Sequence, residues 1–336
     1  MAFSNVYTPS TGVQAPKTGV GSGIGNREDL SNELTLLAPE ETPILSLASK
    51  GKANAVYSEW VTDKLDAPLT AGVAEGADVT SFTDQFSGRA RLGNYVQIFR
   101  RDYQVSQIQQ AVTSVGPANI AQAEAKSMRE LKRDVEYAIC ADQEYAQSAG
   151  TSSTPQLRGL GKWLTPAGTT LANVDAAFQT PANSVYSVSG TAPTETNIND
   201  IVASIFTVNG EANSLTCVAG VSLRKAIANF TRTQVSGTGT YKVNQDATGK
   251  EVTLAVQVFD SDFGIVNIVN ANPVCLTSTN TTAKGYVLNP KYLGFNTLYS
   301  MGATRLENRG GGERGYVDMS GTLCVKHPGA HGKIVY

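Results

Sequence analysis

Residues 55–106 read AVYSEWVTDKLDAPLTAGVAEGADVTSFTDQFSGRARLGNYVQIFRRDYQVS, and this stretch decides the fold of the chain. Its two ends, 55–61 and 95–106, alternate β-branched or aromatic residues with polar ones, which is typical of strands. Ala, Gly, Asp, Thr and Ser dominate the segment 62–94 between them. Because a structureless loop of this length is uncommon inside a compact domain, the stretch predicts a long two-stranded arm that projects from the body.

The arm carries apolar side chains at irregular spacing, and these are Leu65, Leu69, Val73, Val79, Phe82 and Phe86. No local core is available to receive them, and an isolated hairpin is only marginally stable in water. We therefore expect the arm to find its partners on another chain. A disordered surface loop is the alternative that the sequence leaves open.

The residues before the arm predict a flexible start and two short helices. The first 25 residues are polar, rich in Gly, Ser, Thr and Pro, and unable to bury a core. Asn26 is a suitable cap for a helix with leucines along one face, which Pro39 ends. Thr42 followed by Pro43 restarts a short helix, since proline suits the first helical position.

The longest helical pattern begins at Pro117 and runs to about Gln147. One apolar stripe recurs at steps of three and four residues, and it consists of Ile120, Met128, Leu131, Val135 and Ile139. Charged residues, Glu136 among them, occupy the other faces. Such a helix would be roughly 45 Å long at 1.5 Å per residue. With a single narrow apolar face, it must lie along a sheet or another helix.

The alternation of helices and strands after residue 196 predicts a separate α/β lobe. Its expected elements are a helix from Asn197 or Asn199 to Gly210, a strand at 215–219, a helix at 222–230, and strands at 250–259 and 264–269. Further strands are expected at 286–288 and 323–326. The glycine-rich turn 310–312 lies between these last two strands.

Composition and charge exclude several classes of protein. Charged residues make up 17% of the 336 residues, less than the usual quarter of a soluble domain, which is typical of a surface that is hidden against copies of itself. The net charge of −2 argues against a dedicated nucleic-acid binder, because phosphate contacts require clustered Lys and Arg. No apolar run is long enough to span a bilayer. The N-terminus lacks a signal-peptide pattern, so we expect the protein to stay in the cytoplasm where it is made.

Neither a catalytic, a cofactor-binding nor a metal site is predicted. The four cysteines, Cys140, Cys217, Cys275 and Cys324, lie far apart and form no CxxC pair, so they are expected to be buried, reduced thiols. Cys324 and His327 are three residues apart, which places them on opposite faces of an extended strand. Asp262-Phe263-Gly264 matches the magnesium-binding tripeptide of protein kinases, but the other kinase motifs are missing.

Eight residues of the arm region are candidate intersubunit contacts. The aromatic anchors would be Trp60, Phe82, Phe86 and Tyr95, with the core of the subunit itself as the alternative position for each. The only basic concentration consists of Arg89, Arg91, Arg100 and Arg101. We expect these arginines on a solvated strand face or paired with acids of a neighbour, and contact with DNA is the alternative.

Short motifs along the chain resemble a family of tailed-phage major capsid proteins. They are Arg27-Glu28-Asp29-Leu30, Ala38-Pro39-Glu40-Glu41-Thr42-Pro43-Ile44-Leu45, Tyr57-Ser58-Glu59-Trp60, Glu75-Gly76-Ala77-Asp78, Gly93-Asn94-Tyr95, Glu130-Leu131-Lys132-Arg133-Asp134, Asp262-Phe263-Gly264, Asn289-Pro290 and Ala330-His331-Gly332. Each motif is short, and only the set is specific. Together they extend over most of residues 26–336.

The resemblance implies an α+β fold of the Hong Kong 97 capsid type (HK97), with named parts. These would be an N-terminal arm with short helices at 1–50, an extended β-hairpin loop at 51–110, a peripheral domain at 111–196 with a spine helix at 117–147, an axial domain at 197–285, and C-terminal strands at 286–336 that return to the peripheral domain. Residues 1–25 are too few for a long helical scaffolding domain. A separate scaffolding protein, or none, is therefore expected.

The predicted function is that of a major capsid protein of a tailed double-stranded DNA bacteriophage, which self-assembles into an icosahedral head in the virion. Its expected partners are copies of itself in hexamers and pentamers and a portal. A separate scaffolding protein and decoration proteins are further partners that the sequence leaves open. It would enclose DNA without sequence-specific binding and without a membrane. A shell protein of an encapsulin-like nanocompartment is one alternative. An enzyme with its active site in the α/β lobe is an alternative of another class.

Overall fold

A computed structural model of the chain describes residues 41–112, 119–147, 154–212, 214–230, 234–236, 239–241, 257–276, 285–308 and 310–336. The predicted N-terminal arm and the predicted helix from Asn26 to Ala38 lie outside these residues. The same is true of most of the strand expected at 250–259. Its described end belongs to strand β9, Val258–Ser261.

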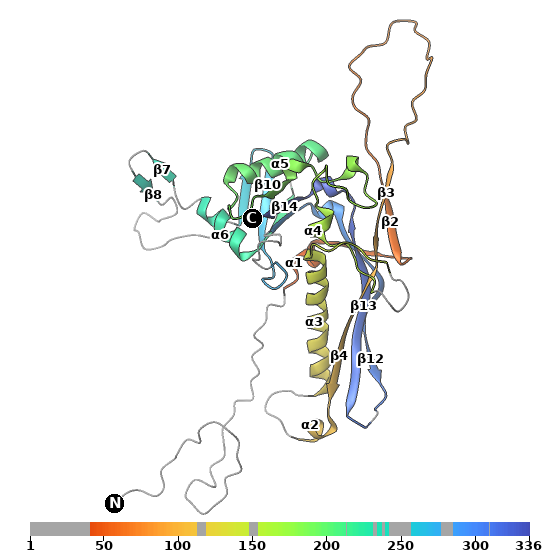
Figure 1. Ribbon diagram of the computed structural model, residues 1–336, viewed down its shortest axis with the longest axis vertical. Helices are drawn as coiled ribbons and strands as arrows, with labels where there is room; N and C mark the ends of the chain where they lie inside the picture. The colour runs from red at the N-terminus through yellow and green to blue at the C-terminus, as the bar shows by residue number, and fades with distance from the viewer. Residues whose placement is uncertain are drawn as a thin grey trace, which may run out of the picture.

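A four-stranded sheet forms the long part of the body (Figure 1). Its order is β1-β12-β13-β4, with β1 at Ser49–Lys52, β12 at Leu293–Leu306, β13 at Glu313–Val325 and β4 at Gln97–Val105. Strand β1 is parallel to β12, and the other neighbours are antiparallel. Because β4 belongs to this sheet, the boundary that placed 51–110 in an extended loop is wrong at its C-terminal end.

The β12–β13 hairpin is much longer than the sequence predicted. Only 323–326 was expected as a strand here, whereas β13 alone has 13 residues. The register of β12 shifts twice, between Thr297 and Tyr299 and between Tyr299 and Gly302. Such irregularities break the period-two alternation on which strand prediction depends. The glycine-rich turn 310–312 joins the two strands, as its composition suggests.

The long helix α3, Ile120–Cys140, lies along one side of this sheet (Figure 1). The side-chain oxygen of Asn119 caps it by accepting a hydrogen bond from the Gln122 N–H at 2.9 Å. Leu131, Val135 and Ile139 of the predicted stripe are fully buried. With 21 residues, the helix is roughly 31 Å long.

The helix ends seven residues before the predicted boundary at Gln147. The next positions on its apolar stripe after Ile139 are Asp142 and Gln143, which offer nothing to the core. The chain leaves the helix at Ala141 with an extended backbone. The last apolar residue of the stripe therefore predicts the end of the helix better than the helix-favouring residues that follow it.

Glu136 was expected on a solvent-exposed face of the helix, and this prediction is wrong. Its carboxylate is buried and accepts hydrogen bonds from the backbone N–H groups of Ile44 and Leu45, each at 2.9 Å. These residues open the short helix α1, Pro43–Leu47, at the predicted position. Burial raises the pKa of Glu136. The carboxylate thus fixes helix α1 to helix α3.

A six-stranded mixed sheet forms the second part of the body. Its order is β5-β14-β11-β6-β10-β9, with β5 at Val185–Ser187, β14 at Gly332–Val335, β11 at Gly285–Leu288, β6 at Leu215–Ala219, β10 at Gly264–Asn270 and β9 as above. The predicted strands 215–219 and 264–269 are present. However, β14 and β11 were expected to return with 286–336 to the other lobe. They lie inside this sheet instead, so that boundary is wrong.

Two helices accompany the six-stranded sheet, α5 at Glu195–Asn209 and α6 at Val221–Phe230. The cap of α5 is Thr194 rather than Asn197 or Asn199. Asn197 occupies the third helical position, and its side-chain oxygen accepts a hydrogen bond from the Thr194 N–H at 2.9 Å, which completes a capping box. The helix ends as predicted at Gly210, whose φ of 68° suits glycine.

The remaining α-helices and strands of the described residues are short. They are β2 at Tyr57–Thr62, β3 at Ala90–Tyr95, α2 at Gln107–Ala111, α4 at Leu160–Trp163, β7 at Gln234–Ser236 and β8 at Gly239–Tyr241. Among the described strands, β2 and β3 pair only with each other, as do β7 and β8.

His331 predicts how the stability of the subunit depends on pH. Its ring is fully buried, and Nδ1 accepts a hydrogen bond from the Asn289 N–H at 3.1 Å, which requires the neutral imidazole. Burial lowers the pKa of His331 from 6.5 to about 3. His331 therefore takes up a proton near pH 6.5 in the unfolded chain but stays neutral in the folded chain. Its contribution to the free energy of unfolding is fully present above this pH and is lost as the pH falls. Between about pH 7 and about pH 5 the loss should be about 2 kcal/mol.

Urea unfolding at these two pH values measures this effect. His331→Asn serves as the matched variant, since its side chain keeps an acceptor and does not titrate. A loss of stability in the His331→Asn protein as large as in the parent protein would assign the pH dependence to other groups.

Candidate functional site: the projecting arm and its base

Strands β2 and β3 form an antiparallel hairpin that leaves the body at its upper end (Figure 1). The pairing runs from Tyr57 opposite Tyr95 to Thr62 opposite Ala90. The sequence had paired 55–61 with 95–106, and this is wrong by one strand. Residues 97–105 form β4, which belongs to the four-stranded sheet. Its alternating side chains face α3 on one side of the sheet and point away from it on the other. The returning strand of the arm is β3, Ala90–Tyr95, and the tip of the arm is residues 63–89.

The tip of the arm exposes the apolar residues that the sequence singled out. Leu65 is 98% exposed and Phe82 is 90% exposed. Leu69, Val73, Val79 and Phe86 are exposed as well. Fully burying one side chain of this kind is worth roughly 1.5–3 kcal/mol. A single subunit leaves this stabilisation unused, so the tip is suited to a surface on another molecule.

Arg89 and Arg91 both pair with acids of their own arm. Arg89 lies 2.7 Å from Asp63 across the hairpin, and this hydrogen bond lowers the pKa of Asp63. The guanidinium of Arg89 also lies over the ring of Phe86, 4.1 Å from its centroid. Arg91 approaches Glu59 at 3.7 Å. In the single subunit, both arginines thus pair with acids of the same chain.

The other two arginines lie on opposite sides of the four-stranded sheet. Arg100 pairs with Asp318 at 3.2 Å on the side away from α3. Arg101 faces the helix, and its Nη2 donates a hydrogen bond to Asp134 at 2.7 Å. The structure therefore does not bring the four predicted arginines together into one basic patch.

Trp60 and Tyr95 lie at the base of the arm and contact the body of their own subunit. The ring of Trp60 packs 5.7 Å from that of Trp163 and against the main core. Tyr95 lies between Tyr57 and Tyr145, with ring centroids 4.6 and 5.3 Å away. For Trp60 the structure favours the alternative of a position against the subunit core. Tyr95 is partly buried against rings of its own subunit, whereas Phe82 and Phe86 extend outward.

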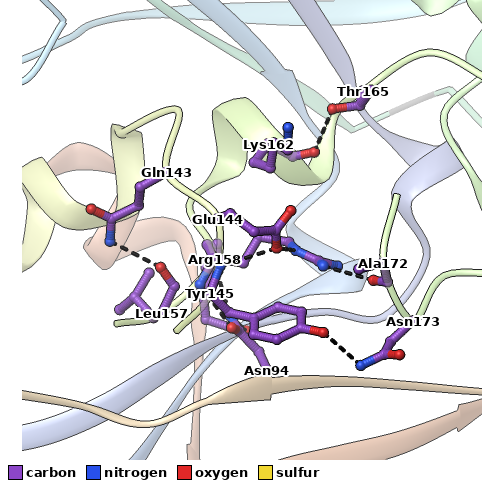
Figure 2. Close-up of polar contacts among 11 residues, drawn as sticks. Asn94, Gln143, Glu144, Tyr145, Leu157, Arg158, Lys162, Thr165, Ala172 and Asn173 are labelled. Carbon is purple, nitrogen blue, oxygen red and sulfur yellow. Dashed lines mark hydrogen bonds and ion pairs between the residues drawn. The ribbon is translucent and has the colours of Figure 1, made fainter. Parts of the chain in front are cut away.

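A buried arginine that sequence reasoning missed lies beside this aromatic cluster (Figure 2). Arg158 is fully buried, its Nε donates a hydrogen bond to Glu144, and its Nη2 donates to the Ala172 carbonyl at 2.7 Å. Its guanidinium stacks on Tyr145 and Trp163, with centroid distances of 4.6 and 4.8 Å. A buried charge requires pairing and hydrogen bonds. Nε and Nη2 of Arg158 have them, whereas Nη1 is buried with no hydrogen-bond partner among the described residues.

Asn94 connects this network to strand β3 of the arm (Figure 2). Its side-chain amide is buried, accepts a hydrogen bond from the Arg158 N–H at 2.8 Å, and donates to the carbonyls of Arg158 and Leu323 at 3.2 and 2.9 Å. The preceding Gly93 leaves room for the Tyr57 ring, since a Cβ there would lie 2.6 Å from it. The sequence analysis placed Asn94 at the end of the 62–94 segment, and only the motif Gly93-Asn94-Tyr95 drew attention to it.

Substitutions of Trp60 and Phe82 should distinguish a residue that packs against the subunit core from one that contacts a neighbouring subunit. We expect Trp60→Ala to lower the free energy of unfolding by about 2–3 kcal/mol, because it empties part of the core. Phe82→Ala should change it by less than about 0.5 kcal/mol and should reduce assembly into particles. Thermal unfolding of unassembled subunits, together with light scattering of assembly mixtures, measures both. Equal destabilisation by the two variants would contradict this assignment.

Outside the arm and its base, the cysteines and His327 are buried in the packing of the subunit. Burial raises the pKa of Cys324 to about 11 and that of Cys217 and Cys275 to about 12, so these thiols stay protonated. All four cysteines are buried and free. His327 packs against the rings of Phe178 and Tyr292. The described part of the chain holds no group of three His, Cys, Asp or Glu residues that is suited to a metal ion.

Among the helices within the described ranges, none is both long and apolar enough to cross a membrane. No curated protein sequence matches the chain significantly.

The fold is similar to solved capsid structures over nearly the whole chain. A structure titled "Capsid structure of the Cyanophage P-SCSP1u" has a TM-score of 0.62 at 13% identity, covering 95% of each chain. "Capsid of native GTA particle computed with C5 symmetry" has a TM-score of 0.59 at 13% identity, covering 94% of this chain and 96% of that one. "Asymmetric unit of bacteriophage PhiM1 mature capsid" has a TM-score of 0.59 at 11% identity, with coverages of 95% and 94%. The HK97-like fold implied by the sequence motifs is confirmed.

The sequence itself matches one protein family along almost its entire length. Residues 10–335 match the family described as SU10 major capsid protein. The match includes both sheets, helix α3 and the arm. This chain therefore belongs to the SU10 major capsid protein family.

Proposed function

We propose that the chain builds the icosahedral head of a tailed phage by laying its arm across an adjacent subunit. The observation that carries this proposal is the arm tip, where Leu65, Phe82 and four further apolar side chains are exposed in the single subunit. Membership of a major capsid protein family supplies the partner, which is another copy of the same chain. Burial of the tips in a lattice would then supply the stabilisation that a monomer lacks.

The base of the arm holds the arm in a fixed direction, which the proposed assembly requires. The Arg158–Asn94 network fixes strand β3 to the body, so the arm leaves each subunit in a defined direction. A fixed direction allows repeated contacts between neighbours to close into a shell rather than extend into open fibres. Many weak contacts per subunit let assembly errors dissociate, while their sum holds the finished lattice.

The finer parts of the proposal concern partners. Subunits would form hexamers and pentamers through the α/β lobe, together with a portal, a separate scaffolding protein and decoration proteins. The shell would enclose double-stranded DNA and assemble in the host cytoplasm. The family is one of structural capsid proteins, and it favours a phage head over an encapsulin-like compartment with enzyme cargo.

Electron microscopy of the expressed protein, alone and with a cognate scaffolding protein, tests the proposal. We expect closed, thin-walled shells of uniform diameter. Persistent monomers under both conditions, with the arm protected from proteolysis, would overturn it.

A further inference from the structure

Strand β4 has one edge that no other described strand occupies. It stands last in the four-stranded sheet and pairs with β13 along its whole length, from Gln97 opposite Gly321 to Val105 opposite Glu313. On its other side, no backbone N–H or C=O group of β4 has a backbone partner among the described residues. A free edge of nine residues is a site to which a strand of another chain can pair.

The other edges of the two larger sheets suit such an addition less well. They belong to β1, β5 and β9, which have four, three and four residues. Strand β1 also carries Lys50 and Lys52, both exposed, and lysines on an edge strand disfavour pairing with another chain. Strand β4 therefore provides the longest free edge of these two sheets within the described residues.

Exposed apolar side chains border this edge on both sides of the sheet. On the side turned away from α3, Ile98 of β4 is 53% exposed. On the other side, Tyr137 is 55% exposed and lies one turn of α3 beyond Asp134, which binds Arg101 of β4. Both arginines of β4 pair with acids of their own subunit, since Arg100 binds Asp318. A strand added at this edge would therefore meet one apolar side chain on each of its faces.

The arm tip contains a segment that matches this edge in length and pattern. Residues 77–84 lie between two turns and form neither helix, turn nor strand in the single subunit. Their sequence, ADVTSFTD, includes Val, Phe and two Thr, which are residue types that favour strands. Val79 is 71% exposed and Phe82 is 90% exposed. Because these two residues are three apart, they would lie on opposite faces of an extended strand.

We propose that residues 77–84 of a neighbouring subunit add as a fifth strand to the free edge of β4, an inference that rests on the proposed capsid function. Eight residues of a strand span roughly 26 Å, close to the roughly 30 Å of β4. Backbone hydrogen bonds to β4 supply affinity in this mode of binding, and the side chains supply specificity. Val79 and Phe82 would contact Ile98 and Tyr137, one pair on each face of the extended sheet. These contacts fix the register of the added strand.

Pairs of introduced cysteines test where the arm tip binds in assembled shells. One cysteine replaces Thr80 or Ser81, which face opposite sides of an extended segment, and the other replaces Asp102 or Gln104, both exposed on β4. The four native cysteines are buried. After mild oxidation of shells, we expect at least one pair to give a ladder of disulfide-linked chains on a non-reducing gel. The matched control has its second cysteine at Lys50, on the opposite edge of the sheet, and should give a several-fold weaker ladder.

Three other results of this experiment would overturn the inference. A ladder from β4 no stronger than that from Lys50 would place the tip on another surface. Linked dimers from the single variant Gln104→Cys would mean that β4 pairs with β4 of a neighbour. A linked single chain would mean that the arm folds onto its own sheet. In each case the parent protein still forms shells, whereas failure of the proposed function leaves no shells to oxidise.

Proline substitutions test whether backbone hydrogen bonds carry the contact. Successive N–H groups of an added strand point alternately toward β4 and away from it, and proline is tolerated only where the N–H faces away. Thr80→Pro and Ser81→Pro should therefore differ several-fold in the yield of shells, measured by light scattering. Neither N–H has a hydrogen-bond partner among the described residues, so both variants should fold. Equal yields from the two variants would mean that side chains alone bind the tip and would refute strand addition.

Discussion

A subunit whose arm tip is replaced by a short turn is expected to fold normally and to form no closed shells. In this variant an Asn-Gly turn replaces residues 65–87. The ends of the tip are already adjacent, since a Cβ on Gly88 would lie 3.5 Å from Cγ of Lys64. The removed apolar side chains are all exposed, so the core loses nothing. The shorter loop should even lower the entropy cost of closure by about 1–2 kcal/mol.

Size-exclusion chromatography and electron microscopy measure this result, and urea unfolding confirms that the subunit remains folded. The matched control keeps the full arm length and replaces the apolar side chains of the tip with serine. It should fail to assemble as well, because the arm then reaches its neighbour without apolar contacts. Normal shells from the serine variant would show that the apolar side chains do not drive assembly. Normal shells from the shortened variant would refute the role of the arm altogether.

The second large effect is expected at Arg158. We expect Arg158→Met to lower the free energy of unfolding by about 2–4 kcal/mol, because it removes a buried guanidinium whose hydrogen bonds reach a half-exposed Glu144 and the Ala172 carbonyl. The change removes the partner of Glu144 and leaves the Ala172 carbonyl without its donor. Since Asn94 binds the backbone of the same residue, the arm base should loosen together with the core.

Chemical unfolding measures the loss of stability, and hydrogen exchange at residues 90–95 measures the loosening of the arm. Arg91→Met is the matched control. It removes an exposed ion pair at 3.7 Å in the same hairpin and should cost less than about 0.5 kcal/mol. Similar losses in the two variants would mean that the buried network contributes no more than a surface pair.

The sequence predicts the elements whose signals are local. The stripe of Leu131, Val135 and Ile139 predicts α3, and Gly210 predicts the end of α5. The arm is predicted because its apolar residues have no neighbours in sequence that form a core with them. Each of these signals lies within a few turns or strands of the chain, where periodicity and capping rules apply.

The arm base and the sheet order depend on contacts that are remote in sequence. Asn94 binds Arg158 and Leu323, which are 64 and 229 residues away. Glu136 binds the N–H of Ile44 across 92 residues. A charged residue in a helical pattern is indistinguishable from a solvated one until its remote partner is known. For the same reason, strands β11 and β14 could not be assigned to their sheet from the sequence.

Photo-crosslinking from position 82 tests most directly whether the arm tip contacts a second subunit. A benzophenone amino acid replaces Phe82, which is 90% exposed and whose loss should leave the fold intact. We predict crosslinked dimers and larger species on irradiation of assembled shells, with the crosslinks mapping to the body of another subunit. Unassembled subunits at the same total concentration should give none. Crosslinks within one chain, in shells and free subunits alike, would contradict the account.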